Sequence, residues 1–156
     1  MINAAQHEQL LKGVNPNRIA KRQGGGGKSL SYLEAWEVKA HLIRIFGFGG
    51  WSWTVIKAEL AFEEQNERGN WNVGYKVIGR LYISQLECDY AEAAVGSASL
   101  SQRGEAHDMA IKTAESDALK RAAINLGDQF GLSLYNNGAT APVVLNTLVG
   151  TGEVNE

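Results

Sequence analysis

The chain has 156 residues, of which 44% are hydrophobic and 21% charged, and its formal net charge is −2. These values are typical of one soluble globular domain, and the bulk charge does not indicate nucleic acid. The single cysteine, Cys88, excludes an internal disulfide and a cysteine-based metal site. The sequence opens without a signal-peptide pattern, and no apolar run approaches the roughly 18 residues that span a membrane. We therefore expect a cytoplasmic protein with no metal, cofactor or membrane partner.

Basic residues are concentrated near the N-terminus. No acid occurs between Glu8 and Glu34, whereas five cations do: Lys12, Arg18, Lys21, Arg22 and Lys28. Because charges more than about 8 Å apart are largely screened at physiological salt, distant acids do not cancel this strip. The segment can bind phosphates although the protein as a whole is weakly acidic.

The first 50 residues are predicted to hold two helices. Residues 5–12 form a short one, and residues 23–29 form a loop because they contain four consecutive glycines. Residues 31–46 form an amphipathic helix, with Ser31 as N-cap and Glu34 at the capping-box spacing. The expected apolar face of this helix comprises Leu33, Trp36, Ala40, Ile43 and Phe46.

Three long strands follow, at residues 51–63, 71–84 and 88–99. Apolar and polar residues alternate along them, and the segment 67–70 is typical of a hairpin turn. One face of the second strand is expected to comprise Trp71, Val73, Tyr75, Val77, Gly79, Leu81 and Ile83. The pattern predicts an antiparallel β-meander.

A long helix is predicted from about residue 104 to 126. Alanine recurs every four residues along it, at 106, 110, 114, 118 and 122, and such a stripe lets a helix lie close on a sheet. We therefore predict an α+β fold, in which a β-β-β-α core consists of the meander and this helix. Residues 1–135 are expected to form the domain, and residues 136–156 a mobile C-terminal tail.

The end of the predicted long helix carries an adjacent pair of cations, Lys120 and Arg121. Adjacent helical side chains point about 100° apart, so the pair presents a broad cationic edge. Arginine suits a bidentate grip on phosphate, and lysine acts as a point charge. The alternative is that Asp117 pairs with Arg121 at i,i+4, which stabilises the helix slightly. Both can hold.

The glycine run with Lys21, Arg22 and Lys28 is the second cationic candidate, because glycines let backbone amides approach a phosphate closely. Gly27-Lys28-Ser29 also matches the end of a nucleotide-binding phosphate loop. That motif requires a glycine where Arg22 stands and an apolar strand before it. Nucleotide hydrolysis is therefore disfavoured, and a flexible solvated loop is the simpler alternative.

The predicted strands carry further candidates. Lys76 and Arg80 share a face, which either meets DNA or is simply solvated. Trp51, Trp53 and Trp71 are able to stack on bases, although such residues are more typical of a core or a subunit interface. No grouping of serine, cysteine or histidine indicates a nucleophile and its base, so we do not expect an enzyme.

Several motifs occur in a fixed order: the basic segment with its glycine run, Tyr32-Leu33-Glu34, Phe46-Gly47-Phe48-Gly49-Gly50-Trp51, the meander, and Asp117-Ala118-Leu119-Lys120-Arg121-Ala122. In this order they resemble the DNA-binding half of the Rad52 family of single-strand annealing proteins, in a compact form like the phage or bacterial versions. The resemblance covers roughly residues 15–135.

The resemblance implies a ring of subunits that holds single-stranded DNA in a positively charged groove with its bases exposed. Annealing of complementary strands in recombination and repair then needs no ATP. By position, Lys120 and Arg121 match the family's inner-groove basic pair, and Arg22 matches an inner-groove arginine. Further candidates for DNA binding are Lys21, Lys28, Lys76, Arg80 and Arg103.

Two positions depart from the family pattern. Ile124 stands where the family can have a further arginine, and Asn70 stands where it has a lysine of a second, outer DNA site. Arg68 and Arg103 are candidates to substitute for that lysine. The expected partners are single-stranded DNA and further copies of the chain, with a single-strand-binding protein or a recombinase as additional candidates. The competing hypothesis is a non-enzymatic structural or interaction ring without direct DNA function.

Overall fold

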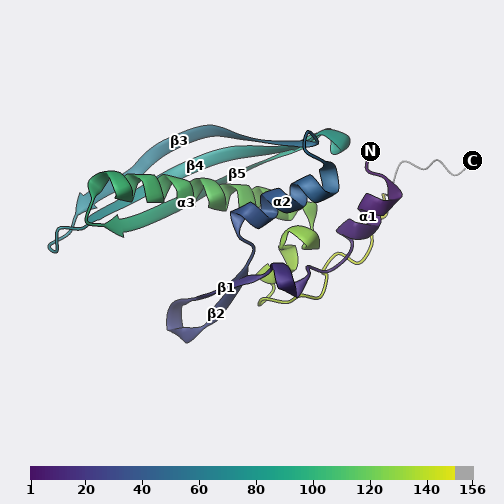
Figure 1. Cartoon of the computed structure of the whole chain (residues 1–156), viewed down its shortest axis with the longest axis horizontal. Helices are drawn as coiled ribbons and strands as arrows, with labels where there is room; N and C mark the ends of the chain where they lie inside the picture. Colours follow the sequence, from purple (N-terminus) through teal and green to yellow (C-terminus); the bar gives the residue numbers. More distant parts are fainter. Residues whose placement is uncertain (150–156) are drawn as a thin grey trace, which may run out of the picture. The chain divides into compact units, whose positions relative to one another are not determined.

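The computed structural model of the protein describes residues 1–149. Its helices and strands (Figure 1) follow in the order α1 (Ala4–Leu10), β1 (Ala20–Gln23), β2 (Ser29–Tyr32), α2 (Ala35–Phe46), β3 (Trp51–Gln65), β4 (Trp71–Ile83), β5 (Cys88–Leu100) and α3 (Arg103–Ala123). The chain forms two compact units. The sheet unit comprises Ser52–Tyr82 and Asp89–Ala122, and the terminal unit comprises Met1–Trp51, Ile83–Cys88 and, of the described residues, 123–149.

The sheet unit has the predicted α+β architecture. Its strands lie in the order β3-β4-β5, and successive strands are antiparallel. The hairpin between β3 and β4 is closed by a 2.8 Å hydrogen bond that the Asn66 amide donates to the Asn70 carbonyl. Figure 1 shows α3 running along one face of this sheet. The meander and its long helix are therefore confirmed.

The alanine stripe of α3 makes the contact with the sheet. All five of its alanines are fully buried. Val73 packs with Ala106 and Ala110, and Val77 packs with Ala114 and Ala118. A methyl group on Gly96 of β5 would lie only 2.3 Å from the backbone nitrogen of Ala114. Small residues on both surfaces thus let the backbones approach one another closely.

Two aromatic rings of β3 lie over glycines of β4. A Cβ atom on Gly79 would be 2.2 Å from the Trp53 ring, and one on Gly74 would be 2.2 Å from the Phe62 ring. Trp53 also donates a 2.8 Å hydrogen bond from Nε1 to Glu115 of α3. Trp53 is therefore part of the core of the sheet unit, which agrees with the core alternative for the tryptophans.

The terminal unit is built around α2. Phe130 is 2% exposed, and its ring lies 6.5 Å from that of Phe46 and 5.2 Å from the imidazole of His41. The chain turns on both sides of this phenylalanine, at Gly127 and Gly131, whose φ angles are +95° and +97°. These left-handed positions favour glycine, which allows the C-terminal segment to wrap around Phe130.

The N-terminal prediction differs from the structure in three details. Residues 24–28 form the predicted glycine loop, but Gln23 and Ser29 belong to strands, because β1 and β2 pair around the loop as an antiparallel hairpin that was not predicted. Ser31 therefore lies in a strand, and α2 begins at Ala35 with Glu34 as an N-cap that forms no side-chain capping bond. Trp36 is 65% exposed. The buried face of α2 instead carries Glu37, Val38, His41, Leu42 and Phe46.

Residues 136–149, the described part of the predicted tail, contact the N-terminal segment and the turn before Phe130. The Val144 amide donates a 3.0 Å hydrogen bond to Asp128, and Thr147 lies 2.9 Å from His7. The predicted boundary at residue 135 stays a prediction, and residues 150–156 lie outside the described part. Within residues 1–149, no helix is both long and apolar enough to cross a membrane.

Candidate nucleic-acid interface

The β1–β2 hairpin carries three of the predicted DNA-binding residues. Lys21 and Arg22 lie on β1, opposite Ser31 and Leu30, and Lys28 directly precedes β2. All three side chains are exposed. None of them forms an ion pair with another residue of the described chain, in contrast to the cations of the sheet unit described below.

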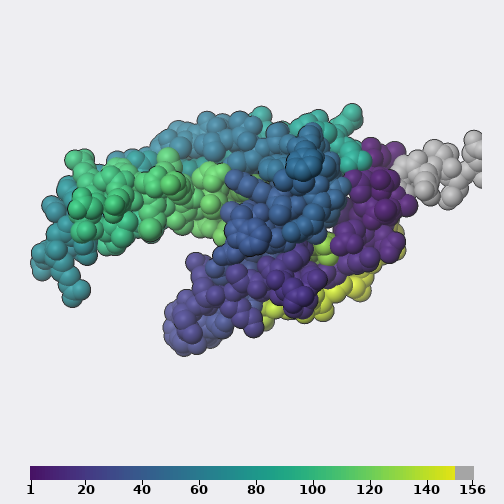
Figure 2. Space-filling view, viewed as in Figure 1, coloured from purple at the N-terminus to yellow at the C-terminus, as the bar shows by residue number. Residues whose placement is uncertain are grey.

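The tip of this hairpin requires glycine. Gly26 and Gly27 have φ angles of +72° and +76°, a region that side-chain-bearing residues rarely adopt. A Cβ atom on either of them would have no neighbour within 4 Å, so the tip is open to an approaching ligand. Figure 2 shows the hairpin standing out from the surface of the terminal unit. Lys28 leads into a strand rather than a helix, so the hairpin lacks the helix N-terminus of a phosphate loop.

Arg22 is held in place by an aromatic partner. Its guanidinium carbon lies 5.5 Å from the centroid of the Tyr32 ring on the paired strand. This cation–π contact restricts the side chain without neutralising its charge. Arg22 therefore keeps its five donors for an external anion such as phosphate.

Lys120 and Arg121 lie in the last turn of α3, where the helix dipole favours cations. Lys120 is 3.1 Å from Asp117, and Arg121 is 3.6 Å from Glu92 of β5. The alternative pairing of Asp117 with Arg121 is therefore replaced by these two pairs. The Arg121 side chain is 52% exposed, so its loose contact with Glu92 leaves donors at the surface.

The cations of the sheet each meet an acid. Lys76 lies 3.7 Å from Glu59, and Arg80 lies 3.3 Å from Asp89. Arg103 binds Glu63 through two hydrogen bonds of 3.1 and 2.9 Å. Its guanidinium also lies 5.0 Å from the centre of the Trp71 ring. The pairs of Lys76 and Arg80 favour the solvated-surface alternative for these two cations, and contact of Lys76, Arg80 and Arg103 with DNA stays a prediction.

The predicted groove draws on both units. Arg22 belongs to the terminal unit, and Lys120 and Arg121 belong to the sheet unit. That the three line one groove stays a prediction.

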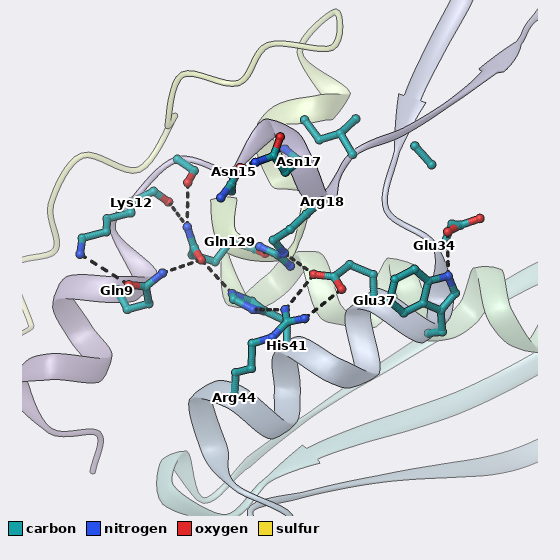
Figure 3. A pocket seen from close by; sticks show the side chains of 14 residues that line it. Gln9, Lys12, Asn15, Asn17, Arg18, Glu34, Glu37, His41, Arg44 and Gln129 are labelled. Atoms are coloured by element: carbon teal, nitrogen blue, oxygen red, sulfur yellow. Dashed lines mark hydrogen bonds and ion pairs between the residues drawn. The ribbon is translucent and has the colours of Figure 1, made fainter.

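Sequence reasoning missed a buried polar cluster in the terminal unit (Figure 3). Glu37 of α2 accepts hydrogen bonds from Arg44 at 2.8 and 3.2 Å and from Arg18 at 2.5 Å. The hydrogen bonds from Arg44 and then Arg18 lower the pKa of Glu37 to about 2, although burial opposes them. Two cations therefore share one carboxylate. The spacing of Glu37 and Arg44 by seven residues, two helical turns, is the signal that could have predicted this pair.

His41 completes the cluster as a neutral imidazole. Nε2 lies 2.8 Å from the Gln129 side-chain oxygen and donates to it, and Nδ1 accepts from Arg44 at 3.0 Å. Gln129 in turn donates to the carbonyls of Lys12 and Gly13. A neutral imidazole has one donor and one acceptor, and this geometry uses both. Burial, helped by the charge of Arg18, lowers the pKa of His41 to about 4.

We predict that His41 makes folding acid-sensitive. Its pKa lies below the unfolded value of about 6.5. The unfolded chain therefore binds the proton first, and stability falls as pH drops from about 6.5 to 4. The shift corresponds to about 3 kcal/mol when fully expressed. Urea unfolding at several pH values should show this loss, and His41→Gln should remove it. His7→Gln is the matched control and should keep it; an unchanged pH dependence in His41→Gln would contradict the assignment.

The chain belongs to the Rad52/22 family of double-strand break repair proteins, whose family model matches residues 3–147. It is similar to the DNA repair and recombination protein rti1 of Schizosaccharomyces pombe, with 34% identity over 128 residues that cover 81% of this chain and 34% of that protein. The DNA repair and recombination protein rad22 of the same yeast is 33% identical over 131 residues, covering 81% of this chain and 27% of its own.

A third relative, the DNA repair and recombination protein RAD52 of Saccharomyces cerevisiae, is 31% identical over 138 residues, which cover 86% of this chain and 28% of that protein. The chain therefore spans about a third or less of the length of these relatives. The family predicted from the sequence motifs is confirmed.

Proposed function

We propose that this protein binds single-stranded DNA and anneals complementary strands without ATP, in DNA repair and recombination. The observation that carries the proposal is the β1–β2 hairpin, whose cations Lys21, Arg22 and Lys28 are exposed and unmatched by acids of the described chain. Family membership supports the same function, because the relatives are named as DNA repair and recombination proteins.

For this mechanism the protein needs to contact only the sugar-phosphate backbone of the DNA. Lysine and arginine side chains neutralise phosphates, and the counterions that they release drive binding irrespective of sequence. Neutralised strands repel one another less, and their base edges stay available for pairing. Base pairing then supplies the free energy of annealing, so hydrolysis of a nucleotide is not required. Arg22, Lys120 and Arg121 are the residues that we assign to these phosphate contacts.

We also propose that the subunits assemble into a ring. β3 and β5 are the edges of the three-stranded sheet and have unpaired backbone groups on their outer sides. Large apolar side chains are exposed along these two strands, namely Val55, Ile56, Leu60 and Phe62 on β3 and Val95 on β5. An isolated subunit would leave these groups in water, whereas neighbouring subunits can cover them.

Light scattering and electron microscopy of the purified protein test the ring. We expect a closed oligomer at micromolar concentration. Leu60→Glu places a charge among the exposed apolar residues and should shift the distribution toward smaller species, whereas Phe48→Glu is the control at an 88% exposed apolar residue of the terminal unit. Detection of monomer alone in the wild type would refute the assembly.

Strand annealing tests the function itself. Complementary oligonucleotides with a fluorophore and a quencher should anneal faster with the protein in the absence of ATP. Binding to single strands should weaken steeply as salt rises. An assembly that forms a ring yet neither binds nor anneals oligonucleotides would favour the competing hypothesis of a structural ring without direct DNA function.

A further inference from the structure

The buried polar cluster forms one wall of an open pocket in the terminal unit (Figure 3). The pocket has a volume of about 710 Å³, which lies within the range of small-molecule sites. Its lining comes from α1, the segment that leads into β1, and α2, with Gln129 at its base. None of the hairpin cations Lys21, Arg22 and Lys28 lines the pocket, although its lining extends to Ala20, the first residue of β1.

The charge of this pocket favours an anion. Three cations line it, namely Lys12, Arg18 and Arg44, against the two carboxylates Glu34 and Glu37. Arg18 Nη2 is buried and donates no hydrogen bond to any residue of the described chain. The Arg44 side chain is 51% exposed and lines the pocket, and its guanidinium also binds Glu37 and His41. Lys12 is accessible as well, because its 3.5 Å contact with Glu8 is a solvated surface pair.

An aromatic ring and an amide lie in the same pocket. Trp36 is 65% exposed on the first turn of α2, and its Nε1 donates a 2.7 Å hydrogen bond to Glu34 that fixes the indole. A fixed, exposed indole is a stacking surface for a base. Asn17 is exposed at the opposite segment, and its backbone amide rather than its side chain is bonded to Asn15. The Asn17 side chain thus remains available to a base edge.

We propose that this pocket binds a single nucleotide, a nucleoside monophosphate unit, with its base against Trp36 and its phosphate at Arg44 and Lys12. An acidic peptide would satisfy the cations but would leave the indole face and the Asn17 amide without partners. The unit comes either from a free nucleotide or from one nucleotide of a bound strand. The strand source rests on the proposed function, and the free-nucleotide source does not.

Calorimetric titration of the full chain with deoxyadenosine monophosphate tests the site. Stacking on tryptophan contributes about 1–3 kcal/mol per base, so Trp36→Ala should weaken binding about tenfold. Lys12→Gln should weaken it a few-fold. The matched controls are Phe48→Ala and Lys39→Gln, which remove an exposed aromatic and an exposed cation that do not line the pocket. Both should bind like the wild type.

Three results would overturn the proposal: the absence of nucleotide binding, equal affinity of Trp36→Ala and the wild type, or inorganic phosphate binding as tightly as the nucleotide. Repeating the titration with saturating poly-dT separates the two sources of the nucleotide. If the strand displaces the free nucleotide, the pocket binds one nucleotide of the strand. If both bind at the same time, the pocket binds a free nucleotide. Annealing is measured on the same samples. Normal annealing without nucleotide binding would refute the pocket alone, and nucleotide binding without annealing would refute the proposed function alone.

Discussion

Replacing Lys21, Arg22 and Lys28 together by alanine is expected to weaken binding to single-stranded oligonucleotides by orders of magnitude at low salt. Each phosphate contact that is lost removes roughly 0.7 from the slope of log affinity against log salt. Loss of all three should therefore lower the slope by about 2. Poly-dT and mixed sequences should be affected equally, since contacts to phosphates do not read bases.

Fluorescence anisotropy at several salt concentrations measures this effect, and a thermal melt checks the fold. The fold should persist, because the three side chains are exposed and make no ion pairs with the described chain. Lys112→Ala is the control, an exposed cation of α3 that is paired with Asp108. An unchanged slope in the triple variant would show that the hairpin does not meet the DNA.

The same assay separates two roles of Arg121. If Arg121 holds phosphate, Arg121→Ala should flatten the salt slope and weaken binding more than Lys120→Ala, because a guanidinium can grip phosphate bidentately. If Arg121 only pairs with Glu92, Arg121→Ala should have a slightly lower melting temperature and an unchanged salt slope of binding. The contact with Glu92, at 3.6 Å on a half-exposed side chain, is too loose for a large effect on stability.

The substitution Gly96→Ala is expected to destabilise the sheet unit by about 3 kcal/mol or more. The new methyl would lie 2.3 Å from the Ala114 nitrogen and 2.7 Å from the Ala110 carbonyl oxygen. Both atoms belong to the backbone of α3, so the helix must move away from β5 and lose contact along the alanine stripe. Urea unfolding measures the loss.

Gly104→Ala is the matched control for this variant. A Cβ atom at Gly104 would meet nothing within 4 Å, and the residue lies in the first turn of α3. The change should be neutral or should stabilise the protein by less than about 1 kcal/mol, because alanine is the better helix former. Equal stability of the two variants would mean that α3 lies less close to β5 than the structure shows.

Periodicity allowed the sheet unit to be predicted. Alternation along β4 and the four-residue recurrence of alanine in α3 are both set by the burial of one face, so the sequence records them directly. Each strand was accordingly placed within two residues.

The terminal unit could not be predicted in the same way. The buried face of α2 includes Glu37 and His41, which a hydrophobicity pattern assigns to solvent. Their burial depends on Arg18 and Gln129, which are 19 and 88 residues away from their respective partners. Long-range pairing of this kind leaves no local period. The β1–β2 hairpin was missed for another reason, because four glycines give no strand propensity on either side of the turn.

Among the candidate site residues, the positive charges could be predicted from the sequence, but the acidic residues that pair with them could not. Of the five cations in the acid-free segment, Lys21, Arg22 and Lys28 form no ion pair within the described chain, whereas Lys12 pairs with Glu8 and Arg18 pairs with Glu37. The strand positions of Lys76 and Arg80 gave no indication that Glu59 and Asp89 would meet them from adjacent strands. Cross-strand partners depend on register, which the sequence alone does not specify here.

The structure supplies that register in the two glycines beneath aromatic rings. Trp53 fits over Gly79, and Phe62 fits over Gly74, because neither glycine carries a side chain. Sliding β3 along β4 by two residues would bring Trp53 and Phe62 onto Val77 and Asn72 in one direction, or onto Leu81 and Lys76 in the other, and all four of these residues carry side chains. Each ring therefore fits over a glycine, and the two pairs together favour one register of β3 against β4 among those that the alternating pattern permits.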